Sequence, residues 1–271
     1  MQYLEFRPHP RLTPVIQCYW TIRGVGSAGD VERVVPDGST EFVLHFGESF
    51  HRIGGAVGRE RQSRALFAGQ MTEHVLLEPG QVVDVVGVRF QPGGAGAFLR
   101  APMAELADEI QDIADVGSPM DATLLERVGE FDDTHDRLAA LERELLDRID
   151  PAAEVDPLVA HVAGRLTESG GNCSLDALAG ECGLGVRQLQ RRFRAGVGIG
   201  PKLFARITRF QGAISMLDGS GPGRFADLAS RCGYFDQAHL IRDFRQFAGI
   251  TPGRFVAESH EMSDHLTGFG P

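Results

Sequence analysis

Hydrophobic and polar residues follow different patterns in the two halves of the chain. Up to about residue 92, short runs rich in β-branched and aromatic residues are separated by turn-forming sequences, which is typical of β-strands. These runs cover residues 3–6, 15–22, 33–35, 41–46, 73–77 and 82–90. Residues 36–38 and 78–81 predict tight turns between strands, and the run 82–90 is apolar enough for a central strand. We therefore expect a small antiparallel barrel or sandwich.

From Gly93 onward the hydrophobic spacing becomes helical. Residues 95–99, 103–110 and 120–129 predict short helices, and residues 134–149 predict a long one. The long helix carries a hydrophobic stripe formed by Leu138, Leu141, Leu145 and Ile149. The stripe predicts either a dimer seam or packing of the helix against its own domain. Residues 151–156 then predict a short linker to the C-terminal part.

A short helix, a glycine turn and a second helix are predicted between residues 224 and 255. Gly233 ends the first helix, and Asp236 can cap the second one. One face of the second helix is hydrophobic at helical spacing, with Leu240, Phe244 and Phe247. Another face is small, apolar and basic, with Ala238, Ile241, Arg242 and Arg245. A helix that lies in a DNA major groove needs such a face, so the stretch predicts a helix-turn-helix unit.

The same helix, turn and helix pattern occurs a second time, about 50 residues upstream. Residues 178–183 match residues 228–233 at an offset of 50, and Phe193 and Arg194 match Phe244 and Arg245 at an offset of 51. In this first unit one helix face is polar and mostly basic, with Arg187, Gln190, Arg191 and Arg194. A predicted helix at 201–217 joins the two units. Two such units in one chain can read two major-groove faces about 34 Å apart.

The charge of the chain is divided between these two parts. The net charge is −10, which by itself argues against a nucleic-acid partner. Residues 174–256, however, contain twelve Lys or Arg and only six Asp or Glu, a balance of +6, and the rest of the chain is at −16. A basic module joined to an acidic remainder fits a DNA-binding domain with a separate sensing or assembly domain.

The repeated half resembles the AraC-type transcriptional regulators. The resemblance is carried by residues 232–237, by Phe244 and Arg245, and by Gly249 to Pro252, and it extends over residues 157–257. It implies a seven-helix DNA-binding domain and a β-rich, often cupin-like, effector or dimerisation domain. Tyr19-Trp20, residues 36–38 and residues 88–93 are also similar to the N-terminal domain of one AraC-type subgroup.

The predicted DNA-contacting residues combine the two basic faces with the positions that the resemblance implies. They are Arg187, Gln188, Gln190, Arg191 and Arg194 in the first unit, and Gln237, Ala238, His239, Ile241, Arg242 and Arg245 in the second. Two positions depart from the family pattern. Gly185 replaces the usual Ser or Thr helix cap, and Asp243 beside Arg242 lowers the charge of the second reading helix. We therefore expect the two units to contribute unequally.

Candidate catalytic and metal-binding residues form no motif. Cys18, Cys173, Cys182 and Cys232 have neither CxxC nor metal-ligand spacing, so free thiols are expected. His45, His51 and His74 lack the His-x-His pair that a cupin metal site needs, and no nucleophile elbow or phosphate loop occurs. We expect no cofactor, no metal and no enzymatic activity. The chain shows neither a signal-peptide pattern nor a run long enough to span a membrane, which predicts a cytoplasmic, nucleoid-associated protein.

The sequence thus predicts an α+β protein in three parts. Residues 1–150 form a β-rich sensor or dimerisation domain with a helical extension, residues 157–257 a double helix-turn-helix domain, and residues 258–271 a flexible tail. The predicted function is that of a bacterial, sequence-specific DNA-binding transcription regulator under an unknown effector. Its predicted partners are double-stranded promoter DNA, a small-molecule effector, a second copy of the chain, and RNA polymerase if it is an activator. The alternatives are a cupin-like enzyme tethered to a DNA-binding module and a repeat domain that binds protein.

Overall fold

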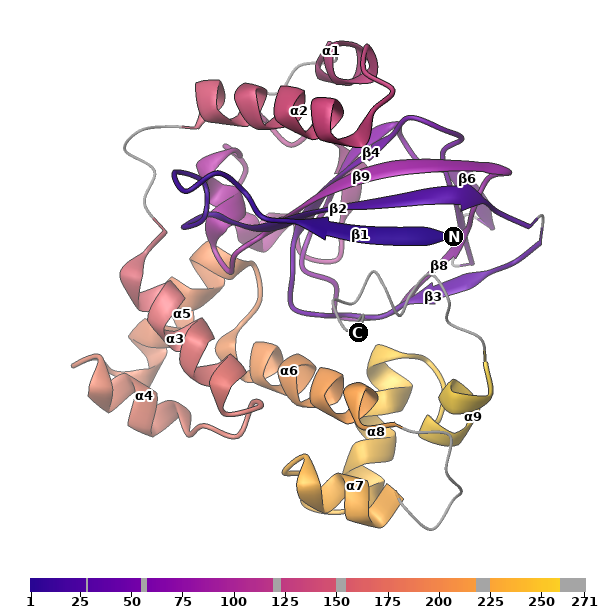
Figure 1. Ribbon diagram of the computed structural model, residues 1–271. Helices are drawn as coiled ribbons and strands as arrows, with labels where there is room; N and C mark the ends of the chain where they lie inside the picture. The colour runs from indigo at the N-terminus through magenta and orange to yellow at the C-terminus, as the bar shows by residue number, and fades with distance from the viewer. Residues whose placement is uncertain (28, 55–57, 119–122, 150–154, 218–224, 259–271) are drawn as a thin grey trace.

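A β-rich half and a helical half lie side by side in the molecule (Figure 1). The computed structural model describes residues 1–27, 29–54, 58–118, 123–149, 155–217 and 225–258. Two helices, α1 and α2, cover one side of the sheets, and the helices α3 to α9 lie on the other side. The predicted linker at residues 151–156 falls, except for Val155 and Asp156, outside the described residues.

The larger sheet has six antiparallel strands in the order β1-β2-β9-β4-β7-β10. Its strands are β1 (Gln2–Phe6), β2 (Ile16–Val25), β9 (Val82–Phe90), β4 (Glu41–His45), β7 (Ala65–Ala68) and β10 (Ile110–Asp112). As predicted, residues 82–90 form an inner strand, which pairs with β2 on one side and with β4 on the other. The prediction of a helix over 103–110 was wrong, because only Met103–Glu105 form a 3-10 turn, η3, before the chain enters β10.

The smaller sheet has four antiparallel strands in the order β3-β8-β5-β6. They are β3 (Glu32–Val34), β8 (Val75–Glu78), β5 (His51–Ile53) and β6 (Arg59–Arg61). The segments at 36–38 and 79–81 therefore do not close hairpins, since each carries the chain from the smaller sheet to the larger one. Both sheets are open. Of the two predicted alternatives, a barrel and a sandwich, the fold is therefore the sandwich.

The larger sheet is buried on both faces. Val83 and Val85 of β9 pack with Trp20 and Leu77 between the two sheets. The other face of β9 contributes Val86, Val88 and Phe90 to a second core. This core also includes residues of the helices α1 (Leu124–Gly129) and α2 (Thr134–Arg148). A strand buried on both faces must be apolar almost throughout, which is the pattern that the sequence shows.

The hydrophobic stripe of α2 packs against its own domain. Leu138, Leu141 and Leu145 are buried in the second core, and Ile149 packs against them. Asp133 caps the helix by accepting from the backbone N–H groups of His135 and Asp136. Of the two predicted roles of the stripe, the intramolecular one is therefore correct.

Among the described residues, seven helices form the C-terminal half. They are α3 (Pro157–Glu168), α4 (Leu175–Glu181), α5 (Val186–Val197), α6 (Pro201–Ser215), α7 (Phe225–Arg231), α8 (Gln237–Phe247) and α9 (Pro252–Ala257). The helix α6 joins the two repeated units through its aromatic side chains. Phe204 stacks edge-on against Phe193 of α5, and Phe210 against Phe244 of α8, at centroid distances of 5.5 and 4.9 Å. Residues 218–224, which include the predicted glycine-rich end of this helix, lie outside the described residues.

A buried polar cluster fixes the middle of the larger sheet. The Arg89 Nε atom donates to Glu41 at 2.8 Å, and the Trp20 Nε1 atom donates to the same carboxylate oxygen at 3.0 Å. The indole ring of Trp20 lies flat over Gly87, where a β-carbon would be only 1.9 Å from the ring. Gly87 is therefore required by the close approach of Trp20.

Gly87→Ala is expected to lower the free energy of unfolding by about 1–3 kcal/mol, because the added methyl group forces Trp20 out of its place. Urea unfolding followed by tryptophan fluorescence measures the change. Gly96→Ala is the matched control, since nothing lies within 4 Å of a β-carbon there. Equal stability of the two variants would contradict the assigned packing.

Candidate functional site

The first helix-turn-helix unit consists of α4 and α5. Ser174 caps α4, and the chain then turns at Gly183. The φ of Gly183 is 64°, in the left-handed region that favours glycine. Helix α5 starts at Gly185, which offers no side-chain cap, as the sequence indicated. Its buried side is formed by Leu189, Phe193 and Val197.

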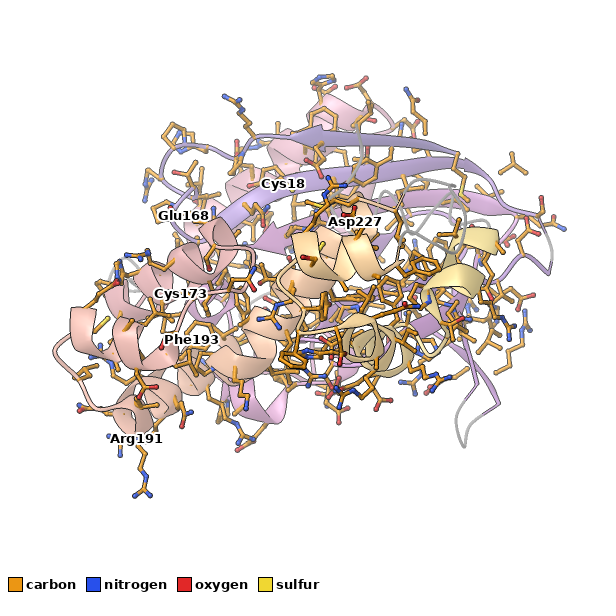
Figure 2. All side chains as sticks on the ribbon, turned by 90° about the horizontal axis from the view of Figure 1, so that it is seen from below. Cys18, Glu168, Cys173, Arg191, Phe193 and Asp227 are labelled. Atoms are coloured by element: carbon orange, nitrogen blue, oxygen red, sulfur yellow. The ribbon has the colours of Figure 1, made fainter. Side chains whose placement is uncertain are left out.

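The opposite side of α5 presents unpaired arginines to solvent. Arg187, Arg191 and Arg194 are exposed, and no ion pair to another described residue holds any of them. Figure 2 shows Arg191 extending away from the body of the protein, on the side of α5 opposite Phe193. The predicted Gln188 and Gln190 are also exposed on this helix. Arg192, by contrast, is engaged in an ion pair with Asp156, at 2.7 Å.

The second unit consists of α7 and α8. Gly233, with φ of 76°, makes the turn, and Asp236 caps α8 by accepting from the backbone N–H of His239 at 2.7 Å. The buried side of α8 contains Leu240, Phe244 and Phe247, as predicted. Gln237, Ala238, Arg242 and Arg245 are exposed. His239 and Ile241 are half-buried, and the His239 ring stands edge-on against Tyr234.

Asp243 does not reduce the charge of the exposed face of α8, and that expectation was wrong. Its side chain is 1% exposed and accepts a hydrogen bond at 2.6 Å from the Arg206 guanidinium of α6. The guanidinium also lies over the Phe247 ring, 5.0 Å from its centroid. Asp243 therefore fixes α8 against α6, and Arg242 and Arg245 keep their full charge on the exposed face.

Arg209 connects the second unit to the loop before the first one. Its Nη2 atom donates to the carbonyl of Gly171 at 2.7 Å, and its Nε atom donates to Asn172. The guanidinium lies 5.4 Å from the centroid of the Tyr234 ring in the second unit. The relative placement of α5 and α8 thus depends on charged contacts of α6 as well as on its aromatic core.

Phe235 is absent from the predicted DNA-contacting residues, but the structure places it next to the exposed face of α8. The side chain is 93% exposed in the turn before α8, directly before the Asp236 cap. The neighbouring Tyr234, by contrast, is buried, at 5% exposure.

A segment of the β-rich half, residues 35–38, packs directly on α6. The Gln211 side chain donates to the carbonyl of Pro36 at 2.5 Å, and Val35 belongs to the core of the helical half. Gly38 lies against the ring of Phe204, where a β-carbon would be 3.2 Å from the nearest ring atom. The two halves are therefore joined at the helix that also connects the two helix-turn-helix units.

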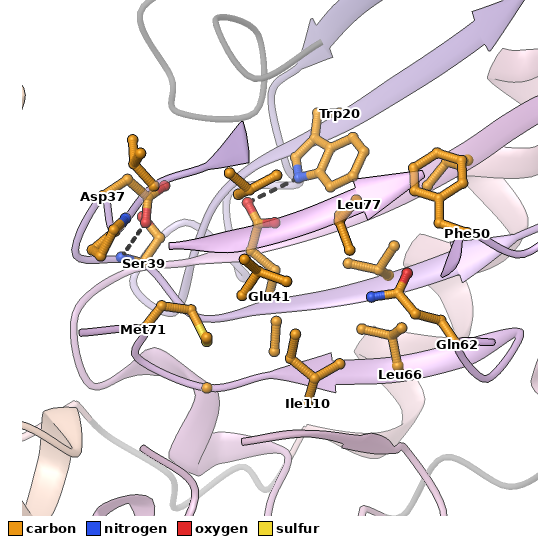
Figure 3. A pocket seen from close by; sticks show the side chains of 18 of the residues that line it. Trp20, Asp37, Ser39, Glu41, Phe50, Gln62, Leu66, Met71, Leu77 and Ile110 are labelled. Carbon is orange, nitrogen blue, oxygen red and sulfur yellow. Dashed lines mark hydrogen bonds between the residues drawn. The ribbon is translucent and has the colours of Figure 1, made fainter. Parts of the chain in front are cut away.

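The same segment forms one wall of a cavity of ≈ 90 Å³ between the two sheets. The lining is mostly apolar and includes Trp20, Phe50, Leu66 and Met71 (Figure 3). Asp37 and Ser39 lie at one end of the cavity, and Gln62 lies toward the other end beside Phe50. A volume of this size exceeds that of one water molecule several times over, since a single water needs about 10–15 Å³ of such space.

Two ionisable side chains that line this cavity have shifted pKa values. His45 is 0% exposed, and burial lowers its pKa to about 4, so the imidazole is neutral. Burial raises the pKa of Glu41 to about 7, although the neighbouring Arg89 acts in the opposite direction. His45, His51 and His74 are not brought together, and no group of three or more His, Cys, Asp or Glu residues with metal-binding geometry occurs in the described part of the chain. All four cysteines are free thiols.

Two domain families match the chain. A domain of unknown function, DUF6597, matches residues 4–112, and a helix-turn-helix domain matches residues 178–258. The C-terminal domain is an AraC-type helix-turn-helix domain. The chain is thus a DNA-binding transcription regulator, a class of protein that is typically not an enzyme.

Solved structures of a Vibrio cholerae protein, ToxT, are also similar to this chain. One crystal structure of ToxT has 10% sequence identity and a TM-score of 0.47, with 88% of this chain and 97% of that chain covered. ToxT with a bound unsaturated fatty acid has 11% identity and a TM-score of 0.43, covering 87% and 94%. No curated protein sequence matches the chain. No helix among the described residues is long and apolar enough to cross a membrane.

Asp243→Ala is expected to lower the free energy of unfolding by about 1–3 kcal/mol, because the half-buried Arg206 loses its carboxylate partner. Asp227→Ala is the control, since Asp227 is exposed and its pair with Arg231 at 3.9 Å is an exposed i,i+4 contact. Urea unfolding followed by circular dichroism at 222 nm compares the variants. A loss no larger for Asp243 than for Asp227 would rule out the anchoring role of Asp243.

Proposed function

We propose that this regulator binds promoter DNA sequence-specifically through the exposed faces of α5 and α8, and that a small molecule bound between the two sheets controls it. The observation that carries the proposal is the repeated exposed basic face. In both units, the side of the helix opposite the buried aromatic residues carries exposed arginines. A guanidinium group that no acidic side chain of its own domain holds remains available to bind phosphate or guanine.

The proposed contacts are divided between base reading and backbone binding. Arg187, Arg191 and Arg242 supply guanidinium forks that match guanine, and Gln190 and Gln237 supply amides that match adenine. Ala238, Ile241 and the exposed ring of Phe235 supply apolar contacts for thymine methyl groups. The remaining predicted residues contact phosphate and sugar in this proposal: they are Gln188, Arg194, His239 and Arg245.

The shared segment at residues 35–38 supports control by an effector. Val35 and Asp37 line the cavity, and the carbonyl of Pro36 between them accepts from Gln211 of α6. A ligand that displaces this segment would therefore act on the helix that positions α5 and α8. The proposal retains the predicted domain limits at 1–150 and 157–257. Homodimer formation and contact with RNA polymerase stay predictions, and the predicted flexible tail lies outside the described residues beyond Glu258.

The affinity for promoter DNA is expected to fall steeply with salt, because each phosphate contact releases a counterion. A plot of log K against log salt concentration should have a slope of roughly −0.9 for each contact. Fluorescence anisotropy with a DNA fragment selected from a random pool provides the measurement. Arg194→Ala should make the slope shallower by about one contact. A salt-independent affinity, or failure of any sequence to be selected, would disprove the DNA-binding proposal.

Arg191→Ala and Arg242→Ala are each expected to relax sequence preference by about 1–3 kcal/mol at one position of the site, the value of a bidentate contact to guanine. Competition with single-base variants of the selected DNA measures the preference. Arg192→Ala is the matched control on α5, because the Arg192 guanidinium is held by Asp156. Loss of preference in the control, with none in the two test variants, would show that the reading faces are misassigned.

A further inference from the structure

The orphaned polar atoms of His45 show what kind of molecule the cavity between the sheets can hold. His45 lines the cavity and is fully buried, and neither ring nitrogen has a hydrogen-bond partner among the described residues. The Gln62 side chain lies close enough to influence the pKa of the ring, but it does not meet hydrogen-bond geometry with either ring nitrogen. Buried polar atoms without partners destabilise the structure, so a group that forms hydrogen bonds with them is favoured in this place.

The neutral imidazole selects the type of group. A neutral ring has one N–H donor and one acceptor nitrogen, and a hydroxyl group can pair with either because it both donates and accepts. A carboxylate can only accept, and it binds strongly where it meets a charged imidazole. The lowered pKa of His45 opposes that charged form.

The charges around the cavity disfavour an anion as well. Among the described lining residues, the only charged side chains are Asp37 and Glu41, both acidic. Arg89 offsets part of their charge but is itself 2% exposed and occupied by Glu41. Arg61 and Arg64 lie near His45 but outside the cavity lining, and both are exposed to water, which screens their charge. An anion placed here would be buried without a cationic partner.

The rest of the lining defines the body of the ligand. Aromatic and aliphatic side chains such as Trp20, Phe50, Leu77 and Ile110 surround the space between its polar ends (Figure 3). These side chains favour a compact apolar ligand, because binding removes the apolar surface of the ligand from water.

We propose that the cavity binds a small, uncharged, mainly apolar molecule that carries one hydroxyl-type group, and that this group bonds to the ring of His45. The proposal rests on the proposed function, since it names the chemical class of the effector. His45 acts as a specificity residue that distinguishes this class from hydrocarbons, which leave the ring unpaired, and from carboxylates, which bring an anion into a cavity whose charged lining residues are both acidic.

Three benzene derivatives of similar size test this assignment on the full-length protein. They are 4-methylphenol, toluene and 4-methylbenzoate, titrated separately and followed by ligand-detected NMR. We expect 4-methylphenol to bind about 3- to 10-fold more tightly than toluene, which is the value of one net hydrogen bond. We expect 4-methylbenzoate to bind at least about tenfold more weakly than 4-methylphenol. Absence of 4-methylphenol binding, or equal binding of 4-methylbenzoate, overturns the proposal.

Variants of His45 show whether the preference comes from this residue. His45→Phe should retain toluene and lose the preference for 4-methylphenol, and His45→Gln should keep the preference because its amide can still pair with a hydroxyl. His51→Phe is the control, since His51 lies on β5 outside the cavity lining. Circular dichroism and the unchanged toluene affinity show that each variant is folded. A preference that survives in His45→Phe overturns the role of His45.

The DNA affinity measured with and without 4-methylphenol separates this inference from the proposed function. If the ligand binds with the expected preference but leaves the affinity for selected DNA unchanged, control by the cavity fails and the chemical assignment stands. If DNA binding is intact but 4-methylphenol does not bind, the chemical assignment alone fails.

Discussion

The contact between residues 35–38 and α6 is the constraint on which the rest of the molecule depends. Val35 completes the core of the helical half, and the carbonyl of Pro36 is held by Gln211, so this short segment cannot move without disturbing α6. On its other side the same segment closes the cavity between the sheets. The β-rich half is therefore part of the support of the DNA-binding half, in addition to being attached to it through the chain.

The helical half could be predicted closely because its information is local. The spacing of Leu189 and Phe193 and the glycine turns define each unit within about twenty residues, and the repetition supports both units at once. The error at Asp243 has a physical reason. Helical periodicity places it near the exposed face, but its orientation is decided by Arg206 on another helix, and no pattern within α8 contains that information.

The sheets were predicted less well, because strand pairing joins residues that are distant in the chain. The apolar run of β9 indicated an inner strand, but residues 36–38 and 79–81 have the composition of hairpin turns and in fact connect two different sheets. The strand β10 is short, and its edge position is fixed by pairing with β7. The cavity could not be predicted at all, since His45, Asp37 and Phe50 come from separate segments that meet only when the sandwich closes.

If α5 and α8 read DNA as proposed, the different side chains on the two repeated units give the protein a direction on DNA. A symmetric dimer presents two identical faces and reads a palindrome in the same way from either end. In this chain α5 presents Arg187, Arg191 and Arg194, whereas α8 begins with Gln237 and Ala238. In the proposed mode of binding, one bound molecule thus distinguishes upstream from downstream, and inverting its site would turn the β-rich domain toward the opposite flank of the promoter.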